Sequence, residues 1–273
     1  TLLDERGFTA AEVDRAPSSW AVVGDVILLA FEDCERREAV AEALLDLHGE
    51  ADTVLARHGI AGETREPDVE VVTGSGETET IHYEHGTAYA LDLSRVMFAP
   101  GNKAERAHMG EVVEQGETVL DMFAGIGYFT LPMARAGARV TAVEKNPEAF
   151  RFLTENAALN DVHDRVELLL GDCRDAVENR VAAADPRFDR VVMGYYDAYE
   201  YLDSALAALA PGGIVHMHEA TPEAELWDRP ERHLRDAAAA ADRSVEITGR
   251  RRVKSHSEGV WHVVVDARVA GPD

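Results

Sequence analysis

The sequence predicts an α/β fold in which a mostly parallel sheet is closed by an antiparallel hairpin, and two observations lead to this class. After about residue 117, apolar strand candidates alternate with amphipathic stretches of helical periodicity, a pattern typical of a parallel sheet covered on both faces. The length of 273 residues also suits two domains better than one. We therefore expect a small α+β domain over residues 1–90 and the α/β domain over residues 91–273.

The first domain shows strand and helix patterns in turn. An apolar run over residues 20–31 predicts two short strands that turn at Gly24 and Asp25. The next stretch has apolar residues at helical spacing and predicts a helix that ends at Gly49. Residues 68–93 contain three β-rich pieces separated by Gly-Ser-Gly and His-Gly, and they predict an antiparallel meander.

Five strand candidates follow in the second domain, and each but the last leads into a helix-like stretch. They are ETVLDMF (117–123), RVTAVE (139–144), RVELLLGD (165–172), FDRVVMG (188–194) and GGIVHMHE (212–219). Residues 244–269 then give two strand-like runs around Ser-Glu-Gly, which predicts the closing hairpin.

The composition argues against several classes of protein. No apolar run approaches the ~18 residues of a membrane span, and no basic segment followed by an apolar core indicates secretion. Cys34 and Cys173 are far apart and have no metal-ligand spacing. We therefore expect a soluble cytoplasmic protein without a disulfide framework.

The net charge is strongly negative, because 51 acidic residues outnumber 27 basic ones and give −24. Such a surface normally repels nucleic acid, since contacts from Lys and Arg to phosphates dominate affinity. One explanation is a halophilic protein, because the Debye length of ~3 Å at 1 M salt screens the repulsion. The other is a strongly cationic partner, although the acidic residues are spread along the whole chain. We favour the halophilic explanation, under which the net charge does not exclude RNA.

A glycine-rich turn indicates a cofactor site in the second domain. The first strand candidate ends at Asp121, and Gly125 and Gly127 follow before a helix begins. Glycines let the backbone approach a ligand, and a helix N-terminus presents N–H groups to it. Glu144 and Asp172 end the next two strand candidates, so three acids meet at the edge of the sheet where ligands bind. The alternative is that these residues are only helix caps and turn glycines.

The character of the three acids narrows the cofactor. Phe123 stands where a dinucleotide fingerprint has its first glycine, and this replacement departs from the nicotinamide and flavin pattern. Glu144 stands where a carboxylate accepts hydrogen bonds from a ribose diol, and Asp172 can accept from an adenine amine. The set resembles the S-adenosylmethionine (AdoMet) site of the class I AdoMet-dependent, Rossmann-like fold, so the expected cofactor is AdoMet.

Longer stretches extend this resemblance over nearly the whole chain. GDVILL, EHGTAYALDLSRVMFAPGNKAERAHMG, DMFAGIGYFTLP, DRVVMGYYDAYEYLDSAL, GGIVHMHEA and GVWHVVVDA resemble the tRNA guanine-37 N1-methyltransferase and wyosine-pathway family. Two segments depart from the methyltransferase branch of that family. FAPGNKAER (98–106) replaces its Ser-Pro-Arg-Leu form, and MGY (193–195) replaces its Asn-Leu-Pro loop. Both are forms of the branch that transfers the 3-amino-3-carboxypropyl group of AdoMet.

The resemblance implies transfer of this group to 4-demethylwyosine at position 37, in the anticodon loop of phenylalanine tRNA, with release of methylthioadenosine. A sulfonium activates three carbons, so the orientation of AdoMet selects the carbon that is delivered. The alternatives are guanine-37 N1-methylation and a non-catalytic module that binds AdoMet or tRNA. The implied partner is tRNA, with neither DNA nor a membrane, and we expect a monomer.

The resemblance also assigns cofactor contacts. The matching family positions are Ala99, Arg106, Glu144, Asp172 and Cys173, and we also expect contacts at Asp121, Phe123, Gly125, Gly127 and Lys145. Ala99 stands where relatives have Ser, so one hydroxyl contact is missing. For Arg106 the alternative is an ion pair with Glu105 or Glu111 on a helix surface, and for Cys173 it is packing of a buried thiol.

Three side chains are candidates for the chemistry. His218 or Glu219, near the end of the fifth strand, can accept the proton that the acceptor ring loses. Tyr195 can stack on a flipped base, as can Tyr196 and Tyr199, and the alternative for all three is ordinary packing at the start of a helix. A metal site at His216, His218 and Glu219 would need a further ligand from elsewhere in the fold, so we expect no metal.

The segment GRRRVK is the candidate contact to tRNA. Side chains alternate along a strand, so Arg250, Arg252 and Lys254 are expected to share one face. The alternative is a charged edge that discourages aggregation of the strand.

Overall fold

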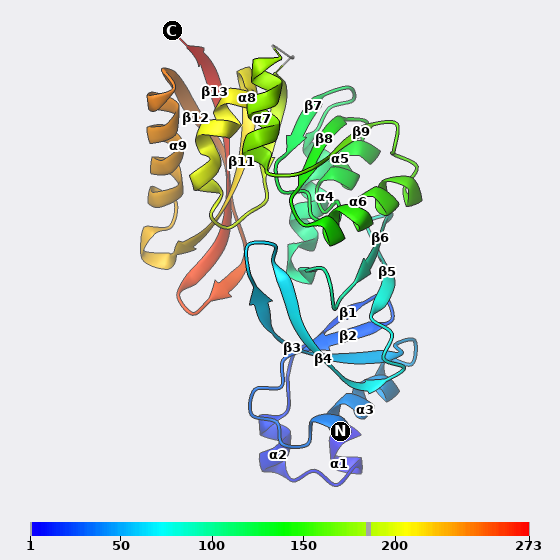
Figure 1. Ribbon diagram of the computed structural model, residues 1–273. Helices are drawn as coiled ribbons and strands as arrows, with labels where there is room; N and C mark the ends of the chain where they lie inside the picture. The colour runs from blue at the N-terminus through cyan, green and yellow to red at the C-terminus, as the bar shows by residue number, and fades with distance from the viewer. Residues whose placement is uncertain (1, 184–186, 273) are drawn as a thin grey trace. The chain divides into compact units, whose positions relative to one another are not determined.

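The chain divides into two units in the computed structural model, which describes residues 2–183 and 187–272 (Figure 1). The first unit ends at Pro100 and the second begins at Gly101. The sequence pattern places the boundary at residue 90, which lies inside strand β6 (Thr87–Asp92). Because β6 pairs with β5 (Glu79–Glu84), both strands remain in the first unit.

A four-stranded sheet in the order β1-β2-β3-β4 forms the first unit together with the β5-β6 hairpin. The remaining elements of this unit are α1 (Leu2–Glu5), α2 (Ala10–Arg15), β1 (Ala21–Val23), β2 (Val26–Leu29), α3 (Arg37–Leu47), β3 (Thr53–Ala61) and β4 (Glu66–Gly74). The strands β1 and β2 pair around Gly24, as the sequence predicts, and α3 ends two residues before Gly49. Ile27, Val40 and Val54 join the sheet and α3 in one apolar core.

The predicted meander over residues 68–93 is confirmed for its last two strands and is wrong for its first. Strand β4 pairs with β3, and β5 pairs only with β6 among the described strands. The sequence pattern misses β3 because its first four residues are all buried and its last five are mostly exposed. That change of environment hides the two-residue period of a half-buried strand.

The second unit is built on a seven-stranded sheet in the order β12-β13-β11-β10-β7-β8-β9. Its strands are β7 (Thr118–Asp121), β8 (Arg139–Glu144), β9 (Val166–Leu170), β10 (Phe188–Met193), β11 (Leu209–Pro222), β12 (Arg243–Ser257) and β13 (Val260–Pro272). Five neighbouring strands, from β9 to β11, are parallel, and β13 and β12 add an antiparallel hairpin. The predicted class, a mostly parallel sheet with a closing hairpin, is confirmed.

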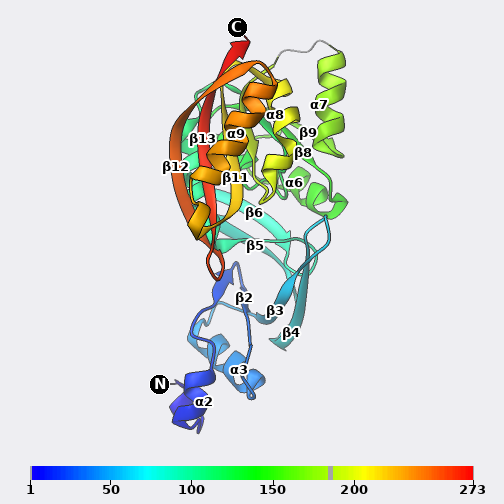
Figure 2. The same ribbon diagram turned by 90° about the vertical axis from the view of Figure 1, so that its left-hand side faces the viewer.

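The helices of this unit include three that lie together on one face of the sheet. In chain order the helices are α4 (Lys103–Val112), α5 (Thr130–Arg135), α6 (Pro147–Leu159), α7 (Cys173–Ala182), α8 (Leu202–Ala208) and α9 (Asp228–Ala240), with short 3-10 turns η1 (Pro100–Asn102), η2 (Ala198–Tyr201) and η3 (Glu223–Glu225). Figure 2 shows α7, α8 and α9 side by side along one face of the sheet. Among the described residues, no helix is both long and apolar enough to cross a membrane.

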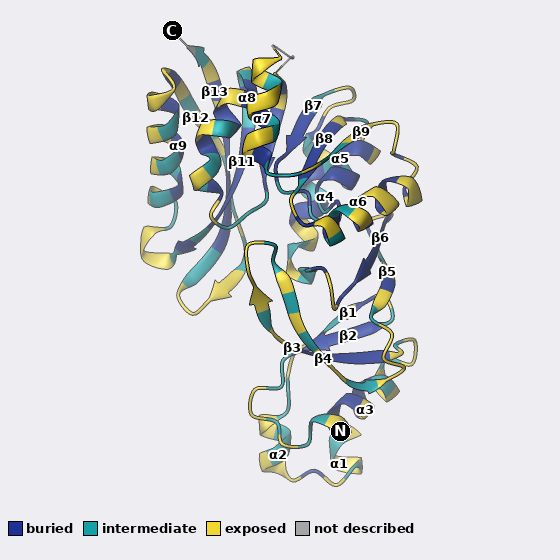
Figure 3. Cartoon of the chain, in the orientation of Figure 1, coloured by how far each residue is buried: buried dark blue, intermediate teal, exposed yellow. Residues whose placement is uncertain are grey.

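Burial follows the position of each strand in the sheet. The central strands β7, β10 and β11 are largely buried, whereas the edge strand β9 has no fully buried residue (Figure 3). Leu120 and Val191 from the sheet pack with Val177 of α7, Leu206 of α8 and Leu234 of α9 in one core. This packing fixes the strands against the helices, and so fixes where the carboxyl ends of the strands lie.

Candidate active site

Three carboxylates lie at the ends of three neighbouring strands. Asp121 is the last residue of β7, Glu144 is the last of β8, and Asp172 follows β9 as the N-cap of α7. Because these strands are adjacent and parallel, their carboxyl ends share one edge of the sheet. The structure therefore brings together the three acids that the sequence places at strand ends.

Asp121 is fully buried, with a hydrogen bond to each oxygen. The Thr130 hydroxyl donates to Oδ2 at 2.7 Å, and the Phe123 amide donates to Oδ1 at 3.4 Å. Burial raises the pKa of Asp121 to about 6, although these hydrogen bonds act in the opposite direction. A buried carboxyl group with such a raised pKa is typical of a site that binds a charged ligand.

Two glycines shape the turn between β7 and α5. Gly125 and Gly127 have φ values of 56° and 102°, in the region that favours glycine. A Cβ atom at Gly127 would lie 2.8 Å from Cγ of Leu131, so the turn has no room for a side chain there. The Gly125 amide donates to Oε2 of Glu144 at 2.6 Å. The turn is thereby tied to the end of the neighbouring strand.

Glu144 also organises the chain after β8. Its Oε1 atom accepts from the Asn146 amide at 2.6 Å, and burial raises its pKa against these backbone hydrogen bonds. Asn146 in turn caps α6, because its side chain accepts from the Glu148 amide at 2.9 Å. One carboxylate thus holds both the glycine turn and the start of α6.

Asp172 is half-buried and is surrounded by cations. It accepts from the Arg174 amide at 3.0 Å and from Lys145 Nζ at 3.3 Å. Hydrogen bonds from the Arg174 guanidinium hold the pKa of Asp172 well below its usual range. Burial raises the pKa of the neighbouring Cys173 thiol to about 12, so the thiol stays protonated. This setting favours the packing alternative for Cys173.

The loop after β10 brings aromatic rings to the glycine turn. Tyr195 stacks on Phe123 with ring centroids 5.2 Å apart, and the edge of Tyr201 meets Phe123 at 5.0 Å. Gly194 lets the loop pass close to α5, because a Cβ atom there would lie 2.8 Å from Cε2 of Phe129. The candidate catalytic Tyr195 and the candidate cofactor contact Phe123 therefore touch each other.

His218 lies within β11 and forms a buried pair with a second histidine. Its Nδ1 atom is 2.9 Å from Nε2 of His262 in β13. Burial lowers the pKa of His218 to about 3 and that of His262 to about 2, so both rings are neutral at neutral pH. Within the described part of the chain, Nε2 of His218 and Nδ1 of His262 have no hydrogen-bond partner.

Glu219 points to the opposite face of the sheet from His218, since neighbours in a strand alternate. It is fully buried, and its carboxylate accepts from His233 Nδ1 at 2.9 Å and from the Thr221 hydroxyl at 3.1 Å, and makes an ion pair with Arg229 Nε at 3.1 Å. A carboxylate that already accepts two hydrogen bonds and pairs with an arginine is poorly placed to take a proton from a ligand. The partners of the Glu219 carboxylate therefore do not suit the role of a base that the sequence predicts for it.

His216 belongs to a buried ionic row rather than to a metal site. Its Nδ1 atom bonds Asp266 Oδ1 at 2.6 Å, and its Nε2 atom bonds Arg190. No group of three or more His, Cys, Asp or Glu side chains in residues 2–183 and 187–272 is arranged to hold a metal ion. The row crosses four strands and reaches α4; it consists of Glu117, Arg190, His216, Asp266, Arg251 and Glu105.

The two candidate contacts before β7 have different settings. Arg106 is only 2% exposed in α4, which excludes the solvated ion pair on a helix surface. Glu105 beside it is also buried and accepts from Arg251 Nη2 at 2.8 Å. Ala99 belongs to the first unit and is half-buried.

The expectation that three basic residues share one face of β12 is wrong for Lys254. A β-bulge lies between Arg252 and Lys254, so Arg252 pairs with Val263 and Lys254 pairs with the next residue, His262. Paired residues point to the same face, and Val263 and His262 point to opposite faces. Lys254 therefore lies on the opposite face from Arg252.

Arg250 and Arg252 remain together on the face of α9, and both are exposed. Arg250 makes an ion pair with Glu231 of α9, and the Arg252 guanidinium lies 5.1 Å from the Trp261 ring. Through Val263, Arg252 lies level with Glu219 at the carboxyl end of β11. These two arginines therefore lie on the α9 face of the sheet, near the carboxyl ends of the strands, where the loop after β10 also lies.

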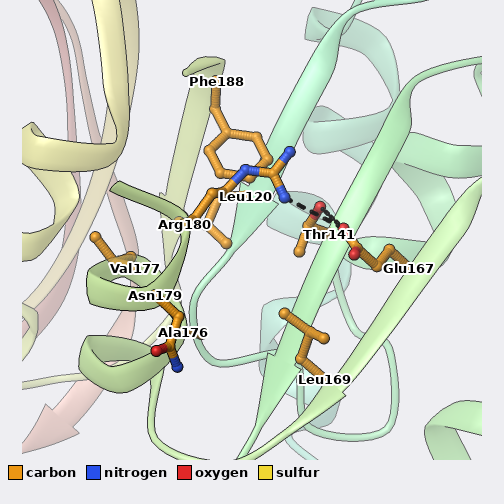
Figure 4. Close-up of a pocket in the computed structure, with 9 residues that line it drawn as sticks. All are labelled: Leu120, Thr141, Glu167, Leu169, Ala176, Val177, Asn179, Arg180 and Phe188. Atoms are coloured by element: carbon orange, nitrogen blue, oxygen red, sulfur yellow. Dashed lines mark hydrogen bonds and ion pairs between the residues drawn. The ribbon is translucent and has the colours of Figure 1, made fainter. Parts of the chain in front are cut away.

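A cavity of about 190 Å³ lies between α7 and the sheet, apart from these groups (Figure 4). Glu167 in its wall accepts from the Thr141 hydroxyl at 2.8 Å and from Arg180 Nη1 at 3.4 Å. Phe188, at the amino end of β10, forms another wall, whereas the three acids lie at the carboxyl ends. None of the candidate site residues lines this cavity.

Sequence reasoning missed the partners that hold the site residues. Arg174 binds Asp172 from the next turn of chain, and Arg229 and His233 bind Glu219 from α9. The only signal for the last pair is their spacing of four residues, which places both on one face of a helix. Nothing in that spacing names Glu219 as the partner.

Protein-family models match both parts of the chain. Residues 80–248 match the TRM5/TYW2 methyltransferase domain, and residues 2–78 match the TYW2 N-terminal domain. The boundary between the two matches lies near the start of β5, whereas the structure divides after Pro100.

Individual relatives agree with these matches. The chain is 39% identical to the tRNA(Phe) (4-demethylwyosine(37)-C(7)) aminocarboxypropyltransferase of Pyrococcus horikoshii, over 93% of this chain and 90% of that protein. It is 29% identical to the tRNA (guanine(37)-N(1))-methyltransferase Trm5b of Pyrococcus abyssi, over 93% of this chain and 76% of that protein. The crystal structure of P. horikoshii TYW2 in complex with MeSAdo superposes with a TM-score of 0.82 at 34% identity, over 98% of this chain and 97% of that one.

Proposed function

This chain belongs to the TRM5/TYW2 family, and we propose that it transfers the 3-amino-3-carboxypropyl group of AdoMet to 4-demethylwyosine at position 37 of phenylalanine tRNA. The observation that carries the proposal is the loop that begins Met193-Gly194-Tyr195, in the place of the Asn-Leu-Pro loop of the methyltransferase branch. The activity for which the Pyrococcus horikoshii relative is named supports the same assignment.

The residues at the sheet edge fit AdoMet. The carboxylate of Glu144 suits the ribose hydroxyls, and that of Asp172 suits the adenine amine. Asp121 supplies a buried negative charge beside the turn, which suits a cationic ligand. AdoMet bound there would supply a sulfonium leaving group next to three activated carbons.

The contribution of the chain itself is orientation. Tyr195 and Phe123 present stacked rings where the methyltransferase branch has a polar loop, so this loop offers fewer polar contacts to a methionine arm. The carbon that reacts is the one held in line with the nucleophile, at about 3–3.5 Å. A loop that does not hold the arm away from the acceptor allows the arm to turn toward it, which favours delivery of its γ-carbon over delivery of the methyl group.

The acceptor ring carbon must lose a proton after the new bond forms, and His218 is the better placed of the two candidate acceptors. Its ring is neutral and its Nε2 atom has no partner among the described residues, whereas Glu219 already accepts two hydrogen bonds and pairs with Arg229. Burial lowers the pKa of His218 to about 3, so the ring is a weak base and would hold the proton only transiently.

Mass spectrometry of the modified nucleoside tests the proposed reaction. The purified protein is incubated with AdoMet and with phenylalanine tRNA that carries 4-demethylwyosine, and the nucleosides are then analysed. We expect the mass of one aminocarboxypropyl group to be gained, with methylthioadenosine as the second product. Tritium on the AdoMet methyl group should remain in methylthioadenosine.

Two outcomes would contradict the proposal. Tritium that enters guanosine 37 of an unmodified tRNA would assign the protein to N1-methylation, the activity for which the Trm5b relative is named. Bound AdoMet with no change in the mass of either tRNA would indicate a binding module.

We further propose that tRNA is bound by a monomer in the cytoplasm. The exposed Arg250 and Arg252 present two positive charges near the carboxyl ends of the strands, where the loop after β10 begins. Both cysteines, Cys34 and Cys173, are free thiols, as is common in a reducing compartment.

A further inference from the structure

Glu219 is a buried charge for which the proposed reaction has no use. Its partners Arg229 and His233 stand four residues apart on α9, one helical turn from each other. Taking a carboxylate out of water is unfavourable unless it is paired and hydrogen-bonded, so this arrangement needs a compensating role or a compensating contact. The contacts of its two partners indicate the role.

Arg229 and His233 also hold one residue of the loop after β10. The ring of His233 stacks on Tyr199 with centroids 4.5 Å apart and an angle of 30° between the planes. The guanidinium carbon of Arg229 lies 5.7 Å from the centre of the same Tyr199 ring. Glu219 therefore fixes the two side chains against which Tyr199 packs.

The backbone of the loop is attached at the same place. Asp197 forms an isolated antiparallel bridge with Glu219, and the Ala220 amide donates to the Tyr196 carbonyl at 3.1 Å. The loop is thus bound to the end of β11 through its backbone and through Tyr199. At its other end Tyr195 packs on Phe123 of the glycine turn.

We propose that Glu219 is a positioning residue for the loop from Tyr195 to Tyr201. It holds α9 and Tyr199 in place, and through them it holds Tyr195 against Phe123, which selects the carbon of AdoMet that is transferred. The inference rests on the proposed function and goes beyond it, because it assigns the choice between two products to a side chain that does not touch the ligand.

The substitution Glu219→Gln tests this role with little change in volume. The new side chain has no charge to pair with Arg229, and only one of its two ends can accept from His233 Nδ1 or the Thr221 hydroxyl. That mismatch loosens α9 and Tyr199 without opening a cavity. Tyr199→Leu removes the stacked ring from the other side of the same link.

A control variant removes a different partner of the same arginine. Oε2 of Glu225 lies 3.8 Å from Nη1 of Arg229, and the Glu225 side chain is 51% exposed. Exposed ion pairs contribute little to stability, so Glu225→Gln is expected to behave like the wild type in every measurement.

The experiment measures AdoMet affinity, the single-turnover rate and the ratio of the two products on tRNA that carries 4-demethylwyosine. Glu219→Gln and Tyr199→Leu are each expected to lower the rate of aminocarboxypropyl transfer by about 10- to 100-fold, as a small misplacement does. We expect AdoMet affinity to stay within about threefold, because the cofactor acids are untouched. A methylated product is expected to appear beside the normal one. The double variant should be no slower than the slower single variant.

The outcomes separate this inference from the proposed function. If the wild type makes no aminocarboxypropyl product, the proposed function fails. If the wild type makes it, and both variants keep the wild-type rate and a single product, the positioning role is overturned. Thermal unfolding of each variant checks that it is folded, and Tyr199→Leu decides the question if Glu219→Gln does not fold.

Discussion

At the scale of single residues, the three acids at the strand ends are under different influences: burial dominates at Asp121 and Glu144, and hydrogen bonds from Arg174 dominate at Asp172. Asp121 has no exposed surface and a pKa raised to about 6, whereas Asp172 is half-buried beside Arg174 and has a lowered pKa. The two carboxylates stand at equivalent ends of parallel strands. Their ionisation is therefore set by local partners and not by the fold.

Asp121→Asn should change how stability depends on pH. The pKa of Asp121 is about 6 in the folded chain against 3.8 in the reference state, so its favourable contribution is complete below about pH 4 and is lost as the pH rises through 6. Relative to the variant, the wild type is expected to lose about 1.5 kcal/mol of unfolding free energy between pH 5 and pH 8. Urea unfolding at the two pH values measures this difference.

If the wild type and Asp121→Asn differ in unfolding free energy by the same amount at pH 5 and at pH 8, the raised pKa of Asp121 is contradicted. AdoMet binding supplies a separate check on Asp121, because the variant also lacks the buried charge. We expect at least about tenfold weaker binding, the usual consequence of losing a hydrogen bond to a charged group.

The sequence identifies the acids but not their partners. Asp121, Glu144 and Asp172 each end an apolar run, and the end of such a run can be located in a sequence. Glu219 ends a similar run, yet its function depends on Arg229 and His233, which come from a helix that packs on the opposite face from His218. Only the tertiary arrangement distinguishes the two kinds of acid.

At the scale of elements, the closing hairpin is joined to α4 by Arg251. Its guanidinium bonds the buried Glu105 of α4 and also Asp266 of β13. Asp266 continues the row to His216 of β11. A single arginine therefore connects a helix and two strands, and the ionic row extends from there across the sheet.

Arg251→Met should destabilise the second unit. It leaves the carboxylates of Glu105 and Asp266 buried without their shared cation, and breaking a buried pair in this way costs about 3–5 kcal/mol. The control is Arg235→Met on α9, where the arginine is 54% exposed and pairs with Glu231, and there we expect less than about 1 kcal/mol. Urea unfolding measures both variants. Equal losses in the two would show that the row contributes no more than a surface ion pair.

Element order could be predicted more fully than strand pairing. The apolar runs from β7 to β11 alternate with helices, so their parallel arrangement follows from the sequence. The bulge that moves Lys254 to the other face of β12 follows only from the pairing with β13. The pairing of β4 with β3 likewise depends on a strand whose pattern changes from buried to exposed at mid-length.

At the scale of the whole molecule, the net charge of −24 opposes the binding of tRNA. We propose adaptation to high salt. At 1 M salt the Debye length is about 3 Å, so the repulsion from each carboxylate reaches only its nearest neighbours. High salt also weakens phosphate contacts, so affinity for tRNA must then rest on a few placed cations and on contacts other than charge. Arg250 and Arg252 are placed in this way, exposed and level with the carboxyl end of β11.

Reversing these two charges should weaken tRNA binding specifically. The double variant Arg250→Glu with Arg252→Glu is expected to lower affinity at fixed salt and to reduce the slope of log K against log salt by about 2, one for each lost phosphate contact. The matched control reverses Arg135 and Arg139, which are also exposed but lie near the amino end of β8, at the opposite edge of the sheet. Both double variants change the net charge equally, so a general electrostatic effect would weaken both alike. Binding titrations across a series of salt concentrations separate the cases, and equal losses would remove Arg250 and Arg252 from the tRNA-binding surface.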